Sequence, residues 1–119
     1  MATIQFSSTR DGAIVTTWAA MAGTDDGAPF RLPCSADLTF QVSGTFGGAT
    51  VTFQGSNNGT TWHALSQKGP ATTNMSYAVS SVHTANETPL FVRPHITGGT
   101  GSSITVILAA FPRYAKTGY

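Results

Sequence analysis

Residues 38–54 read Leu-Thr-Phe-Gln-Val-Ser-Gly-Thr-Phe-Gly-Gly-Ala-Thr-Val-Thr-Phe-Gln and contain the clearest structural pattern of the chain. Apolar and polar residues alternate in residues 38–43 and again in residues 49–54. This period of two is typical of a β-strand with one buried face. Glycines are concentrated between the two stretches, in residues 44–48. The pattern predicts two consecutive antiparallel strands joined by a turn.

The segment that follows predicts a third strand. Asn57-Asn58-Gly59 is a turn signal, because Asn and Gly adopt positive φ at little cost, and we expect positive φ at Gly59. Trp62, Ala64 and Leu65 come directly afterwards. Together the three strands predict a three-stranded antiparallel meander.

The rest of the chain also favours short strands. Further strands are expected at residues 14–18, 75–82, 90–93 and 103–108. The last two are predicted to pair as a hairpin around the glycine-rich residues 97–101, and residues 19–22 are compatible with one helical turn. Short strands about ten residues apart, separated by Gly and Asn turns, are typical of a sandwich or jelly roll.

The sequence therefore predicts an all-β fold, an antiparallel β-sandwich with a jelly-roll-like arrangement. One such domain spans residues 1–119, with extended arms at residues 1–10 and 111–119, since 119 residues suffice for one modest core. The predicted core consists of the inward positions of the strands: Leu38, Phe40, Val42, Val51, Phe53, Trp62, Val92, Ile104, Val106 and Leu108.

The charge content excludes several classes of protein. Only 9% of the residues are charged, with six basic and five acidic residues and a net charge of +1. Disordered chains, coiled coils and nucleic-acid binders all need more charge or a basic patch, so no nucleic-acid partner is expected. Residues 38–67 carry no charged side chain, which leaves strand edges without their usual protection. Either Thr, Gln and Asn side chains keep this surface soluble or other subunits cover much of it, and we favour the second interpretation.

The cysteine count and the apolar runs indicate a cytoplasmic site of synthesis. Cys34 is the single cysteine, so no intrachain disulfide can form. The first residues do not resemble a signal peptide, and no apolar run is long enough to span a bilayer. No membrane partner is expected.

Residues that could carry chemistry are present but not in catalytic patterns. His63, His83 and His95 lack the spacing of metal ligands, and the serines lack a nucleophile-elbow motif. Cys34 is interpreted as a small apolar residue. The glycines of residues 98–101 lead into a strand rather than a helix, which argues against a phosphate loop. We predict no enzyme activity, no cofactor and no metal.

The aromatic residues supply the candidate contact sites. Phe46 lies in the glycine-rich turn and is the first candidate for an exposed contact residue. The other candidates lie near the C-terminal end: Phe111, Arg113, Tyr114, Lys116 and Tyr119. Trp18 and Trp62 leave two interpretations open, namely packing in the core or exposed platforms for sugar rings, and general burial habits favour packing.

One stretch resembles a known β-sandwich motif. Residues 51–62, in which Ser56-Asn57-Asn58-Gly59 is followed by two residues and then Trp62, are similar to a segment of discoidin-like modules and of many small tailed-phage virion proteins. Leu90-Phe91-Val92-Arg93 is similar to a strand that follows later in such domains. The resemblance implies a β-sandwich.

The low charge and the abundance of Thr, Gly and Ala resemble capsid decoration (cement) proteins of tailed phages. That resemblance implies a virion protein on the outer capsid surface, bound to the major capsid protein and associated with itself, with a trimer favoured and a dimer as the other option. The alternatives are a glycan-binding β-sandwich module and a tail or head-fibre component.

Overall fold

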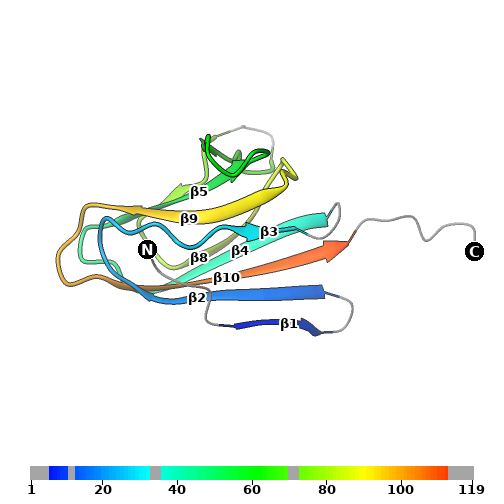
Figure 1. The fold of residues 1–119 in the computed structure, drawn as a ribbon. Coiled ribbons are helices and arrows are strands. Elements are labelled where there is room, and N and C mark those ends of the chain that lie inside the picture. Colours follow the sequence, from blue (N-terminus) through cyan, green and yellow to red (C-terminus); the bar gives the residue numbers. More distant parts are fainter. Residues whose placement is uncertain (1–5, 11–12, 33–35, 70–72, 113–119) are drawn as a thin grey trace, which may run out of the picture.

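The computed structural model describes residues 6–10, 13–32, 36–69 and 73–112. Within these ranges the backbone forms ten β-strands and no helix, arranged as two antiparallel sheets packed face to face (Figure 1). The predicted all-β sandwich is confirmed.

Each sheet draws its strands from distant parts of the sequence. The first sheet has the order β1 (Phe6–Arg10), β2 (Ala13–Met21), β10 (Ser103–Pro112), β4 (Ala36–Thr45) and β8 (Ser81–Thr84). The second has the order β3 (Phe30–Arg31), β9 (Phe91–Thr97), β5 (Thr50–Ser56) and β6 (His63–Ala64). A short strand, β7 (Ser76–Tyr77), also pairs with β5.

The predicted hairpin between β4 and β5 is wrong. β4 pairs with β10 along its whole length, whereas β5 pairs with β9 in the opposite sheet. Residues 46–49, which include Gly47 and Gly48, therefore cross from one sheet to the other. The same correction applies to residues 98–102, which connect β9 to β10 across the sandwich rather than within a hairpin. Only the pairing of β5 with β6 matches the predicted meander.

Two further expectations about local structure are corrected. Residues 6–10, expected in an extended arm, form β1 and pair with β2. Residues 19–21, compatible with a helical turn, continue β2 instead. Ala20 has φ +52°, and the register between β2 and β10 shifts at this point. This irregularity is a β-bulge, which bends the strand while leaving it in the sheet.

The core lies between the sheets and contains the predicted residues, with one exception. All of them are buried except Trp62, which is partly exposed on the outer side of the second sheet. At the centre, the rings of Phe40 and Phe53 stack across the sandwich with centroids 4.2 Å apart. Trp18 is fully buried and its Nε1 donates to the carbonyl of Ala28 at 2.9 Å. It is a core residue, so its interpretation as a sugar platform is wrong.

Candidate functional site

The predicted contact residues have different outcomes. Phe46 is partly buried and packs against the core, so its expected exposure is wrong. Phe111, near the end of β10, is 48% exposed. The remaining candidates, Arg113, Tyr114, Lys116 and Tyr119, lie outside the described residues.

Phe111 belongs to a larger surface, the outer face of the first sheet. On β10 it follows Ile107 and Ala109 at alternate positions, opposite to the buried side of the strand. Directly paired residues of an antiparallel sheet share a face, which extends this surface to β2, β4 and β8. Its other described members are Val15, Thr17, Ala19, Asp37, Thr39, Gln41, Ser43, Val82, Thr84 and Thr105.

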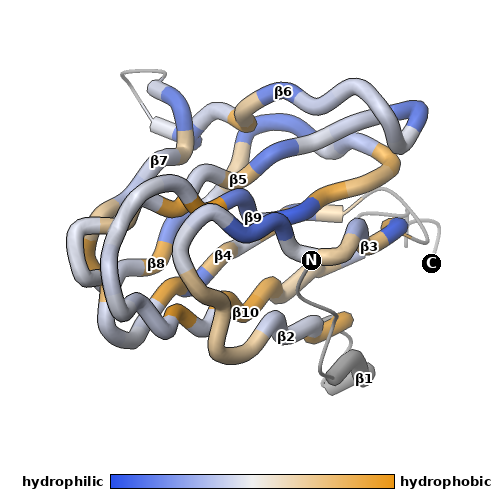
Figure 2. Tube along the Cα trace, turned by 60° about the vertical axis from the view of Figure 1, so that its left-hand side comes forward, coloured by the Kyte–Doolittle hydropathy of each residue, from blue (hydrophilic) through white to orange (hydrophobic). Residues whose placement is uncertain are grey.

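The outer face of the first sheet is almost without charge. Among its described side chains only Asp37 is charged, and Val82 is 57% exposed on the edge strand β8. Strongly hydrophilic residues are instead gathered on the second sheet, most clearly on β9 (Figure 2). The two faces of the sandwich thus differ in chemistry, and the uncharged one is suited to docking against another protein surface.

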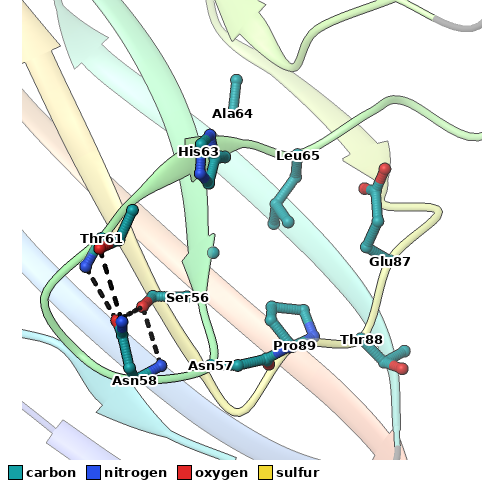
Figure 3. Close-up of a pocket in the computed structure, with 11 residues that line it drawn as sticks. Ser56, Asn57, Asn58, Thr61, His63, Ala64, Leu65, Glu87, Thr88 and Pro89 are labelled. Carbon is teal, nitrogen blue, oxygen red and sulfur yellow. Dashed lines mark hydrogen bonds between the residues drawn. The ribbon is translucent and has the colours of Figure 1, made fainter.

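A groove opens beside the end of β5. It has a volume of about 650 Å³ and is lined by residues 55–58, Thr61, residues 63–65 and residues 87–89. Leu65 and Pro89 lie between the turn that contains Asn58 and Thr61 on one side and Glu87 on the other (Figure 3). The groove therefore combines an apolar floor with polar walls.

The turn on one wall is held by side chains bonded to backbone groups. Ser56 Oγ accepts from the amides of Asn58 at 3.2 Å and Gly59 at 2.9 Å, and it donates to Asn58 Oδ1. That oxygen also accepts from the amides of Thr60 and Thr61, both at 2.9 Å. Gly59 has φ +79°, so the predicted positive φ is confirmed. The turn holds one wall of the groove in a defined shape.

Replacing Gly59 tests this turn. Gly59→Val is expected to lower the free energy of unfolding by about 1–3 kcal/mol, because a β-branched residue is strained at positive φ. A Cβ at Gly59 would be 3.7 Å from the Phe91 ring, an ordinary contact, so the cost arises in the backbone. Urea unfolding measures it, and Gly59→Asn serves as the control because Asn tolerates this conformation. A loss below about 0.5 kcal/mol for the valine variant would contradict the prediction.

The other wall of the groove is anchored as well. Glu87 Oε1 accepts from the backbone amide of Ser66 at 2.7 Å. At the floor, a Cβ on Gly55 would come within 2.5 Å of Pro89 Cγ and 2.7 Å of Leu65 Cδ2. Glycine at this position therefore allows Leu65 and Pro89 to close the bottom of the groove.

Trp62 lies outside the groove, in a charged cluster on the second sheet. The guanidinium of Arg93 is 4.3 Å from the centre of the Trp62 ring and covers one side of it. Arg93 Nε donates to Gln54 Oε1 at 2.8 Å, and its Nη1 is 3.6 Å from Asp26 Oδ2. Asp26 Oδ1 is also paired with Nδ1 of His95. Trp62 is thus packed by its neighbours on the sheet.

Tyr77 and His83 form a second aromatic contact. Their rings are parallel with centroids 3.8 Å apart, and the Tyr77 hydroxyl donates to Gln67 Oε1 at 2.6 Å. Burial disfavours the charged form of a side chain, so it raises the pKa of Tyr77 and lowers the pKa of His83. The uncharged forms suit two rings packed against each other.

The described residues form neither a metal-binding cluster nor a membrane-spanning helix. No group of three or more His, Cys, Asp or Glu side chains in the described ranges is placed to hold a metal ion. No helix in the same ranges has the length and hydropathy needed to cross a membrane. The absence of enzyme activity and of a cofactor remains a prediction from the sequence.

The fold and its two faces define a small antiparallel β-sandwich protein with one sheet face whose described side chains are almost without charge. Its structure is similar to the crystal structure of the SPBc2 prophage-derived protein YomS, with a TM-score of 0.65. The similarity covers 87% of this chain and 98% of YomS at 14% sequence identity, a level that shows a shared fold. No family model matches the sequence, and no curated protein matches it.

Proposed function

We propose that this chain is a structural protein of a phage particle, of the capsid decoration (cement) type. In this role it binds the outer surface of the capsid and stabilises the contacts between subunits of the major capsid protein. The observation that carries the proposal is the outer face of the first sheet, where Asp37 is the one charged residue among the described side chains and Phe111 is exposed. The fold shared with a prophage-derived protein supports it.

The chemistry of this face suits many modest contacts better than one strong attraction. Its Ile, Val, Ala and Phe side chains offer apolar area, and its Thr, Ser and Gln side chains offer hydrogen bonds. With 9% charged residues in the chain, electrostatic steering contributes little, so binding persists at high salt. Repetition of the same contact over the shell raises the total affinity through multivalency.

Self-association belongs to the same proposal. The edge strand β8 has the sequence Ser-Val-His-Thr, without Lys, Glu or Pro, and Val82 on it is exposed. The amide of Lys68 donates to the carbonyl of Thr84 at 2.8 Å and covers one end of this edge. An edge that is not covered is open to pairing with another chain. We expect a homo-oligomer on the particle, with a trimer favoured by the resemblance to decoration proteins. The protein is made in the host cytoplasm and acts without catalysis, cofactor or nucleic acid.

The proposal is tested on purified, expanded capsids with a charge placed on the docking face. Ile107→Lys is expected to weaken capsid binding at least about tenfold, because a lysine in an apolar contact loses hydration without a partner. Thr97→Lys is the matched control, since Thr97 is exposed at the end of β9 in the opposite sheet. Occupancy is measured by quantitative gel analysis after sedimentation, with circular dichroism to verify folding.

Two results would contradict the proposal at different levels. Equal occupancy of both lysine variants would reject the outer face of the first sheet as the contact surface. Absence of the unchanged protein from virions at a fixed stoichiometry would reject the virion role itself. Recovery with isolated tails or fibres, and not with shells, would replace the decoration role by the tail or head-fibre alternative.

A further inference from the structure

The groove beside the end of β5 is separate from the proposed docking face and has unused hydrogen-bonding groups. Its volume of about 650 Å³ is in the range of small-molecule sites. Its apolar floor and polar walls are formed by residues that hold one another in place. We propose that this groove binds a neutral carbohydrate.

Glu87 supplies an oriented acceptor. Its Oε1 is engaged by the amide of Ser66, which fixes the carboxylate and leaves Oε2 for a ligand. Among the described residues Glu87 makes no ion pair. A sugar hydroxyl can donate to this oxygen in a charge-assisted hydrogen bond, which is stronger than a neutral one.

Asn57 supplies an oriented donor. Its Oδ1 accepts from the amide of Leu90 at 3.0 Å, so the orientation of the carboxamide is set and its NH₂ group is left to donate. A hydroxyl group both donates and accepts. An acceptor at Glu87 and a donor at Asn57 therefore match a ligand with several hydroxyl groups, and the Thr88 hydroxyl on the same wall adds a group of either kind.

The apolar floor of the groove matches the C–H groups of a sugar ring. Leu65 and Pro89 present aliphatic carbon between the polar walls (Figure 3). A pyranose ring exposes C–H groups on its faces and hydroxyl groups around its edge. Its C–H groups can therefore pack on the floor of the groove while its hydroxyl groups bond to the walls. Because the walls are already held by backbone hydrogen bonds, little side-chain entropy is lost on binding.

The charge of the groove selects a neutral ligand over an anionic one. Glu87 is the one acidic residue in the lining, His63 is the one other ionisable side chain, and no Lys or Arg accompanies them. Phosphorylated or carboxylated ligands are therefore repelled. The rival ligand is a cation, such as an arginine side chain of another protein, and the experiment below separates the two. The inference does not depend on the proposed virion role.

The test is an NMR titration of the ¹⁵N-labelled full-length protein with lactose, maltose and chitobiose. At least one disaccharide is expected to shift the amide signals of Gly55, Asn57, His63 and Thr88 saturably. Dissociation constants of about 1 mM are expected, equivalent to about 4 kcal/mol of binding free energy. A glycan array then extends the search to other neutral and acidic glycans.

Variants assign the effect to the groove. Glu87→Gln keeps a carbonyl for the Ser66 amide but exchanges the ligand's acceptor for a donor, and it should weaken binding about tenfold or more. Asn57→Asp keeps the acceptor for Leu90 and removes the donor, with the same expected result. Gln41→Asn, on the outer face of the first sheet, is the control and should bind as the unchanged protein does. Unperturbed spectra of the free variants verify folding.

Three outcomes would overturn the inference. The first is an absence of both saturable shifts and array retention. The second is binding that persists unchanged in Glu87→Gln. The third is retention of acidic glycans alone, or saturable binding of arginine amide at Glu87 without binding of any sugar. The last result would assign the groove to a basic segment of a partner protein.

Discussion

Phe53→Ala is expected to lower the free energy of unfolding by about 3–5 kcal/mol. The Phe53 ring is fully buried, stacks on Phe40 at 4.2 Å and meets Tyr77 with centroids 6.0 Å apart. Its removal leaves a cavity at the point where the two sheets touch, and neither sheet can close the space alone. Urea unfolding followed by tryptophan fluorescence measures the loss, which is a large part of the 5–15 kcal/mol typical of a domain.

A neighbouring position provides the control for this experiment. Thr50 lies on the same strand but points outward and is partly exposed, so Thr50→Ala should change stability by about 0.5 kcal/mol or less. A loss below about 1 kcal/mol for Phe53→Ala would mean that the inward and outward faces of β5 are reversed.

Gly47→Val is expected to cost about 3 kcal/mol, because it disturbs the contact between the two connections that cross the sandwich. Gly47 has φ +56°, which strains a β-branched residue. A Cβ there would also lie 2.3 Å from the carbonyl oxygen of Thr100, and a backbone atom cannot rotate away. The amide of Thr100 donates to the carbonyl of Gly47 at 3.0 Å, so the two connections are bonded to each other.

Gly101 separates the two causes of that loss. It also has positive φ, +66°, but no atom lies within 4 Å of the position of a Cβ. Gly101→Val should therefore cost about 1 kcal/mol from backbone strain alone. The difference between the two variants measures the clash. Equal losses in the two unfolding curves would show that residues 44–49 and 98–102 are not in close contact in solution.

Local features of the fold were predictable because their causes are local. Alternation in residues 38–43 and 49–54 identified the buried faces of β4 and β5, since successive strand residues point to opposite sides. The turn at Asn57-Asn58-Gly59 was predictable because positive φ favours these residue types.

Strand pairing was not predictable in the same way. β4 and β5 each have one apolar face. A hairpin would bury these faces as well as the observed arrangement does, in which the two strands lie in opposite sheets. The glycines of residues 44–48 were interpreted as a hairpin turn, but they serve the crossing, where Gly47 and Thr100 approach closely. Tertiary packing decides between the two arrangements, and the contact between the two connections is part of that packing.

For the candidate sites, too, the sequence predicted local features better than features that depend on tertiary structure. Phe111 was predicted to be a contact residue of an extended arm at residues 111–119; it is exposed, but it lies in β10 rather than in an arm. Phe46 was predicted to be exposed and instead packs against the core. Trp62 was predicted to be buried in the core and instead lies partly exposed on the outer side of the second sheet, under Arg93. No motif in the sequence indicated a role for Glu87. Its position opposite Asn58 in the groove depends on segments about 30 residues apart in the sequence.

The amino-acid sequence by itself determined the fold class, the inward face of the long strands and the conformation of the Asn-Gly turn. These depend on side-chain alternation and on φ preferences, which act between near neighbours. Only the tertiary structure decided which strands pair, which sheet face is left without charge and where the groove lies. Interstrand hydrogen bonds join the same backbone groups whatever the side chains are, so the choice of partner is made by the packing of the whole core.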